Sequence, residues 1–346
     1  MSRAASTVSP SDRPIAWWLL ACCALVFLMV MLGGITRLTE SGLSITEWQP
    51  ISGVIPPHDP AQWAAEFARY KAIPQYRAIH ADMTLAQFKT IFYWEYSHRL
   101  LGRLIGAVFL LPFLYFLVRG RISGTLVPKL AAIFALGALQ GAIGWYMVES
   151  GLSGRIEVSQ YRLALHLAMA VLIYAAMLWV ALDLFGGRRG GTIAVRRGAS
   201  AVLALVFVTL VAGAFVAGLR AGYVYNTFPL MGGRWVPEGY FHLAPWYRNF
   251  FANVAAVQFD HRLLAETTVA AIVALWLGAR HSGLAPRQRR ALDALLAMVA
   301  VQAGLGLATL LLVVPLPLAV LHQAGAMGLV TAALVARHGL GAPARL

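Results

Sequence analysis

Cysteine and charged residues are scarce in this sequence. The only two cysteines, Cys22 and Cys23, are adjacent in an apolar stretch, so the chain has neither a structural disulfide nor a cysteine-based metal site. Charged residues make up 12% of the 346 residues, whereas a water-soluble domain carries about 25%. This scarcity excludes a soluble enzyme, and it also excludes a disordered or fibrous chain.

Hydrophobic residues, by contrast, make up 60% of the sequence, and the mean hydropathy is +0.69. These values are typical of a polytopic membrane protein. The net charge of +14 is compatible with nucleic-acid binding. However, the lysines and arginines form short clusters between apolar runs, which is the pattern of membrane topology. We therefore expect the chain to have a lipid bilayer as its partner and not to bind nucleic acid.

Eight stretches are long and apolar enough to span a bilayer, since a spanning helix needs about 20 mostly apolar residues. The segment Met1–Pro14 is interpreted as a short tail before a retained first helix rather than as a cleaved signal. Because a mitochondrial presequence is normally longer, we expect the inner membrane of a bacterium rather than that of a mitochondrion. The predicted spans are residues 16–36, 98–118, 126–148, 161–185, 198–218, 257–279, 291–314 and 318–337.

The charge of the connecting segments predicts the orientation of the chain. The two tails and the even-numbered loops hold fifteen lysines and arginines but only three acids, Asp12, Asp183 and Asp293. The odd-numbered loops carry a nearly balanced mixture of charges. By the positive-inside rule, both termini are cytoplasmic.

Two long segments, 37–97 and 219–256, are then expected on the outer side. In the first, Asp59 is a predicted N-cap of an amphipathic helix over residues 60–70. Thr84 and Gln87 have the spacing of a capping box, which predicts a helix that continues directly into the second span. The second segment is rich in aromatic residues, as is typical of the membrane interface.

The two halves of the sequence repeat each other. The stretch SHRLLGRLIGA from Ser97 matches DHRLLAETTVA from Asp260, LQGAIG from Leu139 matches VQAGLG from Val301, and LHLAMA from Leu165 matches LHQAGA from Leu321. The stretch GGITRLTESG resembles GAFVAGLRAG, which places Arg37 near Arg220. We therefore predict an all-α fold of eight transmembrane helices in two pseudo-symmetric four-helix bundles, residues 1–190 and 191–346, related by an axis along the membrane normal.

Four histidines occur at similar depth, one in each even-numbered span. His98 is aligned with His261 and His166 with His322, near the outer end of each helix. The other five histidines, which are in loops or at a helix end, are interpreted as surface residues: His58, His80, His242, His281 and His338.

This pattern predicts two bis-histidine haem sites, one in each bundle, because haem iron takes an axial ligand on each face and neutral imidazole is a common one. Zinc is less favoured, since no further cysteine or histidine joins the set. Arg99 and Arg262 directly follow two of these histidines and are candidate contacts of haem propionates, or they extend to lipid headgroups. Small residues would let a flat macrocycle approach the backbone: Gly102, Gly106, Gly141, Gly144, Gly304, Gly306 and Gly325.

The two predicted sites differ in one ionisable group. Glu95 precedes His98 by three residues, whereas Gln258 precedes His261 by three. The i, i+3 spacing places Glu95 and His98 on one helix face. A carboxylate in this position is costly and is therefore a candidate functional residue.

Four function classes fit these residues. The first is an enzyme that modifies haem, and the second is a di-haem electron carrier of the cytochrome b type, which does not explain the difference between Glu95 and Gln258. The third is a transporter of haem or a small molecule, but the polar residues are all on the outer side. The fourth is a structural assembly subunit, which needs no matched histidines.

Six stretches across the chain resemble the haem A synthase family. They are GGITRLTESGLSITEWQPISGVIPP (33–57), FKTIFYWEYSHRLLGRLIG (88–106), LHLAMA (165–170), VAGLRAGYVYNTFPLMGG (216–233), QFDHRLLA (258–265) and LHQAGA (321–326). One branch of that family has cysteine pairs in its outer loops. This chain has none there, so it is similar to the branch of proteobacteria and mitochondria.

The resemblance implies an oxidoreductase that converts a ring methyl group of haem O to a formyl group through successive hydroxylations, giving haem A for cytochrome oxidase. It implies that His261 and His322 bind a haem B cofactor. It also implies that His98 and His166 belong to the haem O site, with Glu95 as the acidic residue there. Haem O synthase is an expected partner in the membrane, and the electron donor or acceptor is not specified.

Overall fold

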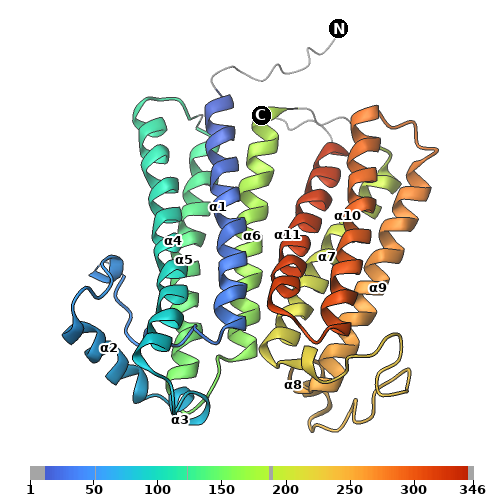
Figure 1. Cartoon of the computed structure of the whole chain (residues 1–346). Coiled ribbons are helices and arrows are strands. Elements are labelled where there is room, and N and C mark those ends of the chain that lie inside the picture. The colour runs from blue at the N-terminus through green and yellow to red at the C-terminus, as the bar shows by residue number, and fades with distance from the viewer. Residues whose placement is uncertain (1–11, 51, 123, 187–189, 342–346) are drawn as a thin grey trace.

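Eight long helices form the body of the molecule (Figure 1). The computed structural model describes residues 12–50, 52–122, 124–186 and 190–341. Within these ranges, eight helices are long and apolar enough to cross a membrane, and no β-strand occurs. They are α1 (Arg13–Leu38), α4 (Leu85–Val118), α5 (Leu126–Leu152), α6 (Gln160–Phe185), α7 (Ile193–Gly218), α9 (Val254–Ala279), α10 (Pro286–Leu311) and α11 (Leu316–Gly339). The prediction of an all-α protein with eight membrane helices is confirmed.

Shorter elements gather at one end of the long helices, which we call the loop end. The start of α1 and the end of α11 both lie at the opposite end (Figure 1). The predicted tail over residues 1–11 lies outside the described residues, as do Arg3, Arg188, Arg189 and Arg345 among the cations counted for topology. The short elements are η1 (Ser52–Val54), α2 (Pro60–Lys71), α3 (Pro74–Ile79), η2 (Ala221–Tyr223), η3 (Trp246–Arg248) and α8 (Asn249–Ala252).

Both helix starts predicted in the first outer segment are confirmed. The Asp59 side chain accepts a hydrogen bond from the backbone N–H of Gln62 at the start of α2. Thr84 and Gln87 form a capping box at the start of α4, which continues without interruption to Val118. The capping box therefore satisfies backbone N–H groups that would otherwise lack partners at the helix end.

Helix packing follows the same order in the first and the last four spans. Helix α1 packs against α4 and α6, and α5 packs against α4 and α6. In the same way, α7 packs against α9 and α11, and α10 packs against α9 and α11. Contacts of α6 with α7, and of α11 with α1 and α6, join the two sets. Many large apolar side chains on the outward faces of these helices are exposed, which is the surface that a lipid bilayer would cover.

A second, smaller core attaches the first outer segment to the helices. The apolar face of α2 presents Trp63, Phe67 and Tyr70, at i, i+4 and i+7, to Phe88 and Phe92 of α4. Removing these rings from water supplies the driving force for docking at this end. The segment is therefore held close to the helix that carries Glu95 and His98.

Candidate functional site

The four histidines of the repeat each lie against a glycine of a neighbouring helix. A Cβ atom at Gly33 of α1 would lie 3.2 Å from Nε2 of His98, and one at Gly144 of α5 would lie 2.9 Å from Cε1 of His166. In the second half, a Cβ at Gly213 of α7 would lie 3.1 Å from Cε1 of His261, and one at Gly306 of α10 would lie 2.8 Å from Cε1 of His322. Side chains at these positions would displace the imidazole rings, so glycine is required for the observed packing.

This arrangement corrects and extends the list of glycines expected from the sequence. Gly144 and Gly306, which were expected to let a macrocycle approach the backbone, lie against histidines, whereas a Cβ at Gly325 would meet the side chain of Gln302. Sequence reasoning missed Gly33 and Gly213, although both open the matching stretches of the repeat. Three of the expected glycines have open space in front of them: Gly106, Gly141 and Gly304.

The histidines form two pairs. His98 of α4 and His166 of α6 belong to the first four spans, and His261 of α9 and His322 of α11 belong to the last four. All four imidazoles are half-buried. Among the described residues, no group of three or more histidine, cysteine or acidic side chains could hold a metal ion.

The second pair has free ring nitrogens that fit a haem. Nδ1 of His261 and Nδ1 of His322 are buried and have no hydrogen-bond partner. A buried polar atom without a protein partner is one that water, an ion or a ligand can satisfy. An imidazole on each of two helices, with a glycine beside each ring, provides donor groups of the kind that a bis-histidine haem requires.

The first pair has an additional polar neighbour. The side-chain amide of Gln140 donates to Nδ1 of His166 at 3.1 Å and to the backbone carbonyl of the same residue at 3.0 Å. Oε1 of Gln140 is buried and has no hydrogen-bond partner. Gln140 therefore fixes the position of the His166 ring, because it hydrogen-bonds both the ring and the backbone of that residue.

Glu95 is one of the most completely hydrogen-bonded acids in the described part of the chain. Its side chain is only 3% exposed. Oε2 accepts from Oγ of Ser44 at 2.7 Å and from the backbone N–H of Ile45 at 2.8 Å. Oε1 accepts from Nε and Nη2 of Arg99 at 3.1 and 2.6 Å. Four donor atoms, two of them from the Arg99 guanidinium, surround the carboxylate and attach the outer segment to α4.

Gln258 has the corresponding place in the second half, with weaker contacts. Its Nε2 donates to the backbone carbonyl of Tyr225 at 3.1 Å, and its buried Oε1 has no partner. The two positions therefore differ in their hydrogen-bond partners as well as in being an acid, Glu95, and an amide, Gln258. Glu95 is surrounded by donors, while Gln258 lacks them.

Arg99 and Arg262 have matching roles as anchors of the outer segments. Nη2 and Nη1 of Arg99 donate to the carbonyls of Ile45 and Glu47 at 2.6 and 2.8 Å. Nη2 and Nη1 of Arg262 donate to the carbonyls of Tyr225 and Thr227 at the same two distances, 2.6 and 2.8 Å. Their contact with haem propionates stays a prediction, and their observed partners are backbone carbonyls.

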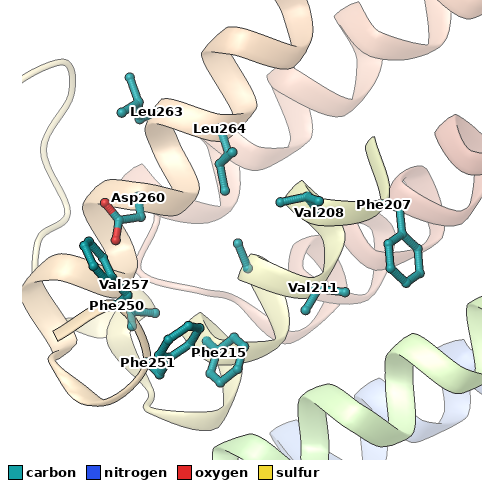
Figure 2. Close-up of a pocket in the computed structure, with 11 residues that line it drawn as sticks. Phe207, Val208, Val211, Phe215, Phe250, Phe251, Val257, Asp260, Leu263 and Leu264 are labelled. Atoms are coloured by element: carbon teal, nitrogen blue, oxygen red, sulfur yellow. The ribbon is translucent and has the colours of Figure 1, made fainter. Parts of the chain in front are cut away.

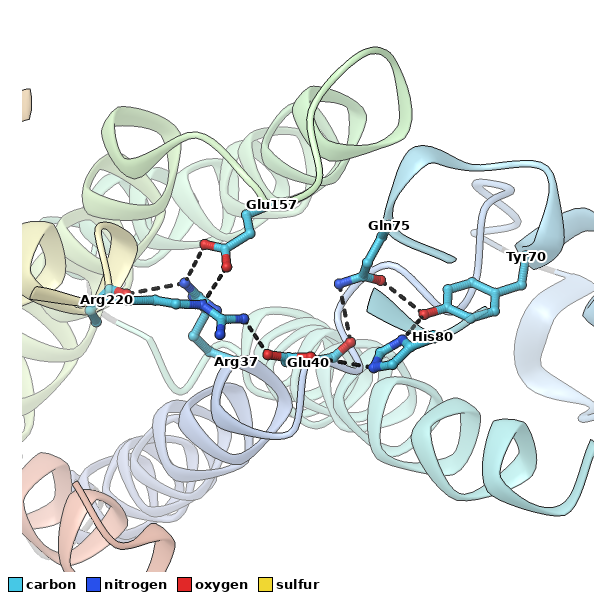
Figure 3. Close-up of polar contacts among 8 residues, drawn as sticks. Arg37, Glu40, Tyr70, Gln75, His80, Glu157 and Arg220 are labelled. Atoms are coloured by element: carbon cyan, nitrogen blue, oxygen red, sulfur yellow. Dashed lines mark hydrogen bonds and ion pairs between the residues drawn. The ribbon is translucent and has the colours of Figure 1, made fainter. Parts of the chain in front are cut away.

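A network of ion pairs joins the two halves at the loop end (Figure 3). Arg37 of α1 donates to Glu157 at 2.9 Å, and Arg220 forms ion pairs with both Glu157 and Glu40. Burial acts to lower the pKa of Arg220, but the two carboxylates outweigh it and raise that pKa. The repeat predicted that Arg37 and Arg220 have similar positions, but it did not predict their shared acidic partners.

Two histidines interpreted as surface residues are in fact paired. Nε2 of His80 lies 3.3 Å from a carboxylate oxygen of Glu40. Nδ1 of the same ring forms a 2.6 Å hydrogen bond with the Tyr70 hydroxyl. His338 is 4% exposed, and its Nε2 lies 2.8 Å from Asp183. The surface interpretation is therefore wrong for His338, because the last turn of α11 packs against the end of α6.

Comparison with known proteins shows the family to which the chain belongs. The model of a cytochrome oxidase assembly protein family matches residues 16–334. The heme A synthase of Nitrosospira multiformis is 54% identical over 334 residues, which cover 95% of this chain and 94% of that protein. The heme A synthases of Nitrosomonas eutropha and Parvibaculum lavamentivorans are 53% and 49% identical, over 94% and 92% of this chain and 93% and 91% of their own lengths. The chain therefore belongs to the haem A synthase family.

Proposed function

We propose that this chain oxidises the ring methyl group of haem O to a formyl group, by way of the alcohol, to give haem A for cytochrome oxidase. The observation that carries this proposal is the difference between two otherwise matching sites. Both have two histidines, two glycines and an anchoring arginine, but only the first has a buried carboxylate.

The first site, with His98, His166 and Glu95, is assigned to haem O. The second site, with His261 and His322, is assigned to a resident haem B, which supplies one-electron redox chemistry when it is bound. The free Nδ1 atoms of the second pair support this assignment. The two sites correspond to proposed units of residues 1–190 and 191–346, with both termini on the cytoplasmic side of a bacterial inner membrane.

The residues around the first site each have a defined task. His98 and His166 orient the macrocycle, and Gln140 holds the second of these rings. Glu95 places a negative charge one helical turn from His98, where it can stabilise positive charge that develops on the ring carbon. Both carboxylate oxygens of Glu95 already accept hydrogen bonds, Oε2 from Ser44 and from the Ile45 N–H. Its primary task in this proposal is therefore electrostatic, and it also keeps Arg99 in place.

A di-haem electron carrier is the alternative function, and substitution of the histidines separates the two. Under our proposal, His261→Ala and His322→Ala lose haem B, whereas His98→Ala and His166→Ala retain haem B but form neither haem A nor the alcohol. His58→Ala is the control, since this side chain is 71% exposed. Equal loss of haem B from both pairs, without modified haem in the unsubstituted protein, would instead support the electron carrier.

A further inference from the structure

A groove lies between α7 and α9, with residues of α8 at one end (Figure 2). Its volume is about 450 Å³. Val211 and Phe215 of α7 line it, whereas Gly213 of the same helix faces His261. Val208 and Leu263 at its margin are 48% and 51% exposed, so the groove opens toward the surrounding membrane.

Asp260 is the only polar residue that lines this apolar groove. The Tyr240 hydroxyl donates to Oδ1 of Asp260 at 2.5 Å. Burial, followed by this hydrogen bond, raises the pKa of Tyr240, so the tyrosine stays a donor. Oδ2 of Asp260 has no hydrogen-bond partner within the described ranges, which leaves one carboxylate oxygen available to a ligand.

The position of Asp260 connects the groove with the second histidine pair. Asp260 directly precedes His261, and the equivalent residue of the first half is Ser97. The second half therefore has an acid on its lipid-facing side that the first half lacks. In the pair Glu95 and Gln258, by contrast, the first half has the acid and the second half lacks it.

We propose that this groove binds the ring of a lipid-soluble quinone, in its oxidised and hydroquinone forms, as the electron partner of the second site. The proposal rests on the proposed function, which assigns a redox haem to His261. The volume and the single polar group are typical of small-molecule sites. Phe215, Phe250 and Phe251 offer aromatic faces to the planar ring in either form, and Oδ2 of Asp260 accepts from a ring hydroxyl of the hydroquinone form only.

The electron count agrees with this ligand class. Conversion of a ring methyl group to the alcohol, with water as the oxygen source, forms a C–O bond and breaks one C–H and one O–H bond. It releases two electrons and two protons. Reduction of one quinone to its hydroquinone takes up two electrons and two protons. Each hydroxylation therefore releases the electrons and protons that reduce one quinone.

Photolabelling of the full chain tests the groove directly. The protein is purified with its haem, reconstituted in phosphatidylcholine vesicles and irradiated with an azido-benzoquinone that carries a short isoprenoid chain. We expect label in the peptides that hold residues 207–215 and 257–264, and we expect unlabelled quinone to compete. Leu263→Trp, which fills the groove, should reduce the labelling, and Leu100→Trp, at the equivalent position of the first half, should not.

A second variant tests the polar contact. Asp260→Asn should weaken binding of the hydroquinone form by about tenfold, because a charge-assisted hydrogen bond from the ring hydroxyl becomes a neutral one, and it should not weaken binding of the oxidised form, which has no hydroxyl to donate. Label elsewhere in the chain, equal labelling of the Leu263 and Leu100 variants, or phospholipid that copurifies in the groove and is not displaced by quinone would overturn the proposal. Labelling does not require haem A formation. A chain that labels in the groove but forms no haem A would therefore contradict only the proposed function, and the reverse result would contradict only the quinone site.

Discussion

Glu40 and Arg220 form an ion pair across the boundary between the first and the last four spans. Each is the second residue after its helix, α1 or α7, and each has a left-handed backbone conformation, with φ of 56° and 52°. A non-glycine residue in this conformation is uncommon. The sequence repeat thus places the same backbone turn at both helix ends, but it places opposite charges on the two turns.

The first prediction concerns the strength of this pair. In a double-mutant cycle with Glu40→Ala and Arg220→Ala, we expect a coupling free energy of about 1–2 kcal/mol, because both side chains are partly buried and Arg220 is also held in place by Glu157. Thermal unfolding in detergent measures it. Arg234 and Glu238 provide the control, since they are 65% and 81% exposed and lie 3.5 Å apart. An equal coupling free energy in the two cycles would show that the pair at the boundary stabilises the fold no more than an exposed ion pair does.

The second prediction compares two glycines of α10. Gly306→Ala introduces a Cβ that would lie 2.8 Å from His322, whereas Gly304→Ala introduces one that meets no atom within 4 Å. We expect the first variant to lose more than half of its bound haem and the second to retain it, as measured by pyridine haemochrome absorbance. Full haem content in the Gly306 variant would show that this contact does not position the imidazole.

The third prediction concerns the donors around Glu95. Glu95→Gln removes the charge that Arg99 faces and turns an amide N–H₂ toward other donors, which we expect to cost about 2–4 kcal/mol of stability. Haem A formation should be lost while haem B stays bound. Ser44→Ala removes one donor of four and should cost about 1 kcal/mol. A Glu95→Gln protein with unchanged stability and haem A yield would remove this carboxylate from the mechanism.

The fourth prediction is a pH dependence of stability. Burial, together with the nearby Glu40 and Glu95 carboxylates, raises the pKa of Tyr70 above its usual value. Below about pH 10, the tyrosine is neutral in the folded and the unfolded chain. Above that pH, only the unfolded chain loses the proton, so stability falls as the pH rises.

Thermal unfolding between pH 8 and pH 11 measures this effect. Tyr70→Phe should start from a lower melting temperature, because it lacks the hydrogen bonds to Gln75 and His80, but it should lose less on going to pH 11. Tyr247→Phe is the control, since that side chain is 55% exposed. Parallel curves for all three proteins would refute the role of Tyr70.

Local patterns in the sequence predicted the helices well. The start of α4 followed from Thr84 and Gln87, and the start of α2 followed from Asp59, because capping depends on neighbours within one turn. The spans followed from the length of apolar runs, since the hydrocarbon core fixes how many residues must be apolar. The repeat identified the four histidines and Glu95 as candidate site residues, because two stretches of sequence can be aligned without knowing how the helices pack.

Contacts between distant segments could not be predicted in this way. Arg99 anchors the outer segment through carbonyls of Ile45 and Glu47, and backbone carbonyls leave no signature in a sequence. Glu157 receives Arg37 and Arg220 only because the spans of the two halves pack together. His338 was misinterpreted for a related reason, since a position near the chain end gave no sign of its burial against Asp183.

The most direct test of the central claim is chromatography with mass analysis of the haems extracted from the purified full chain, co-expressed with a source of haem O. The account predicts haem A or hydroxylated haem O together with unmodified haem B, because the two histidine pairs hold different haems. Two unmodified haem B molecules per chain, with haem O available, would contradict it and would make the protein an electron carrier.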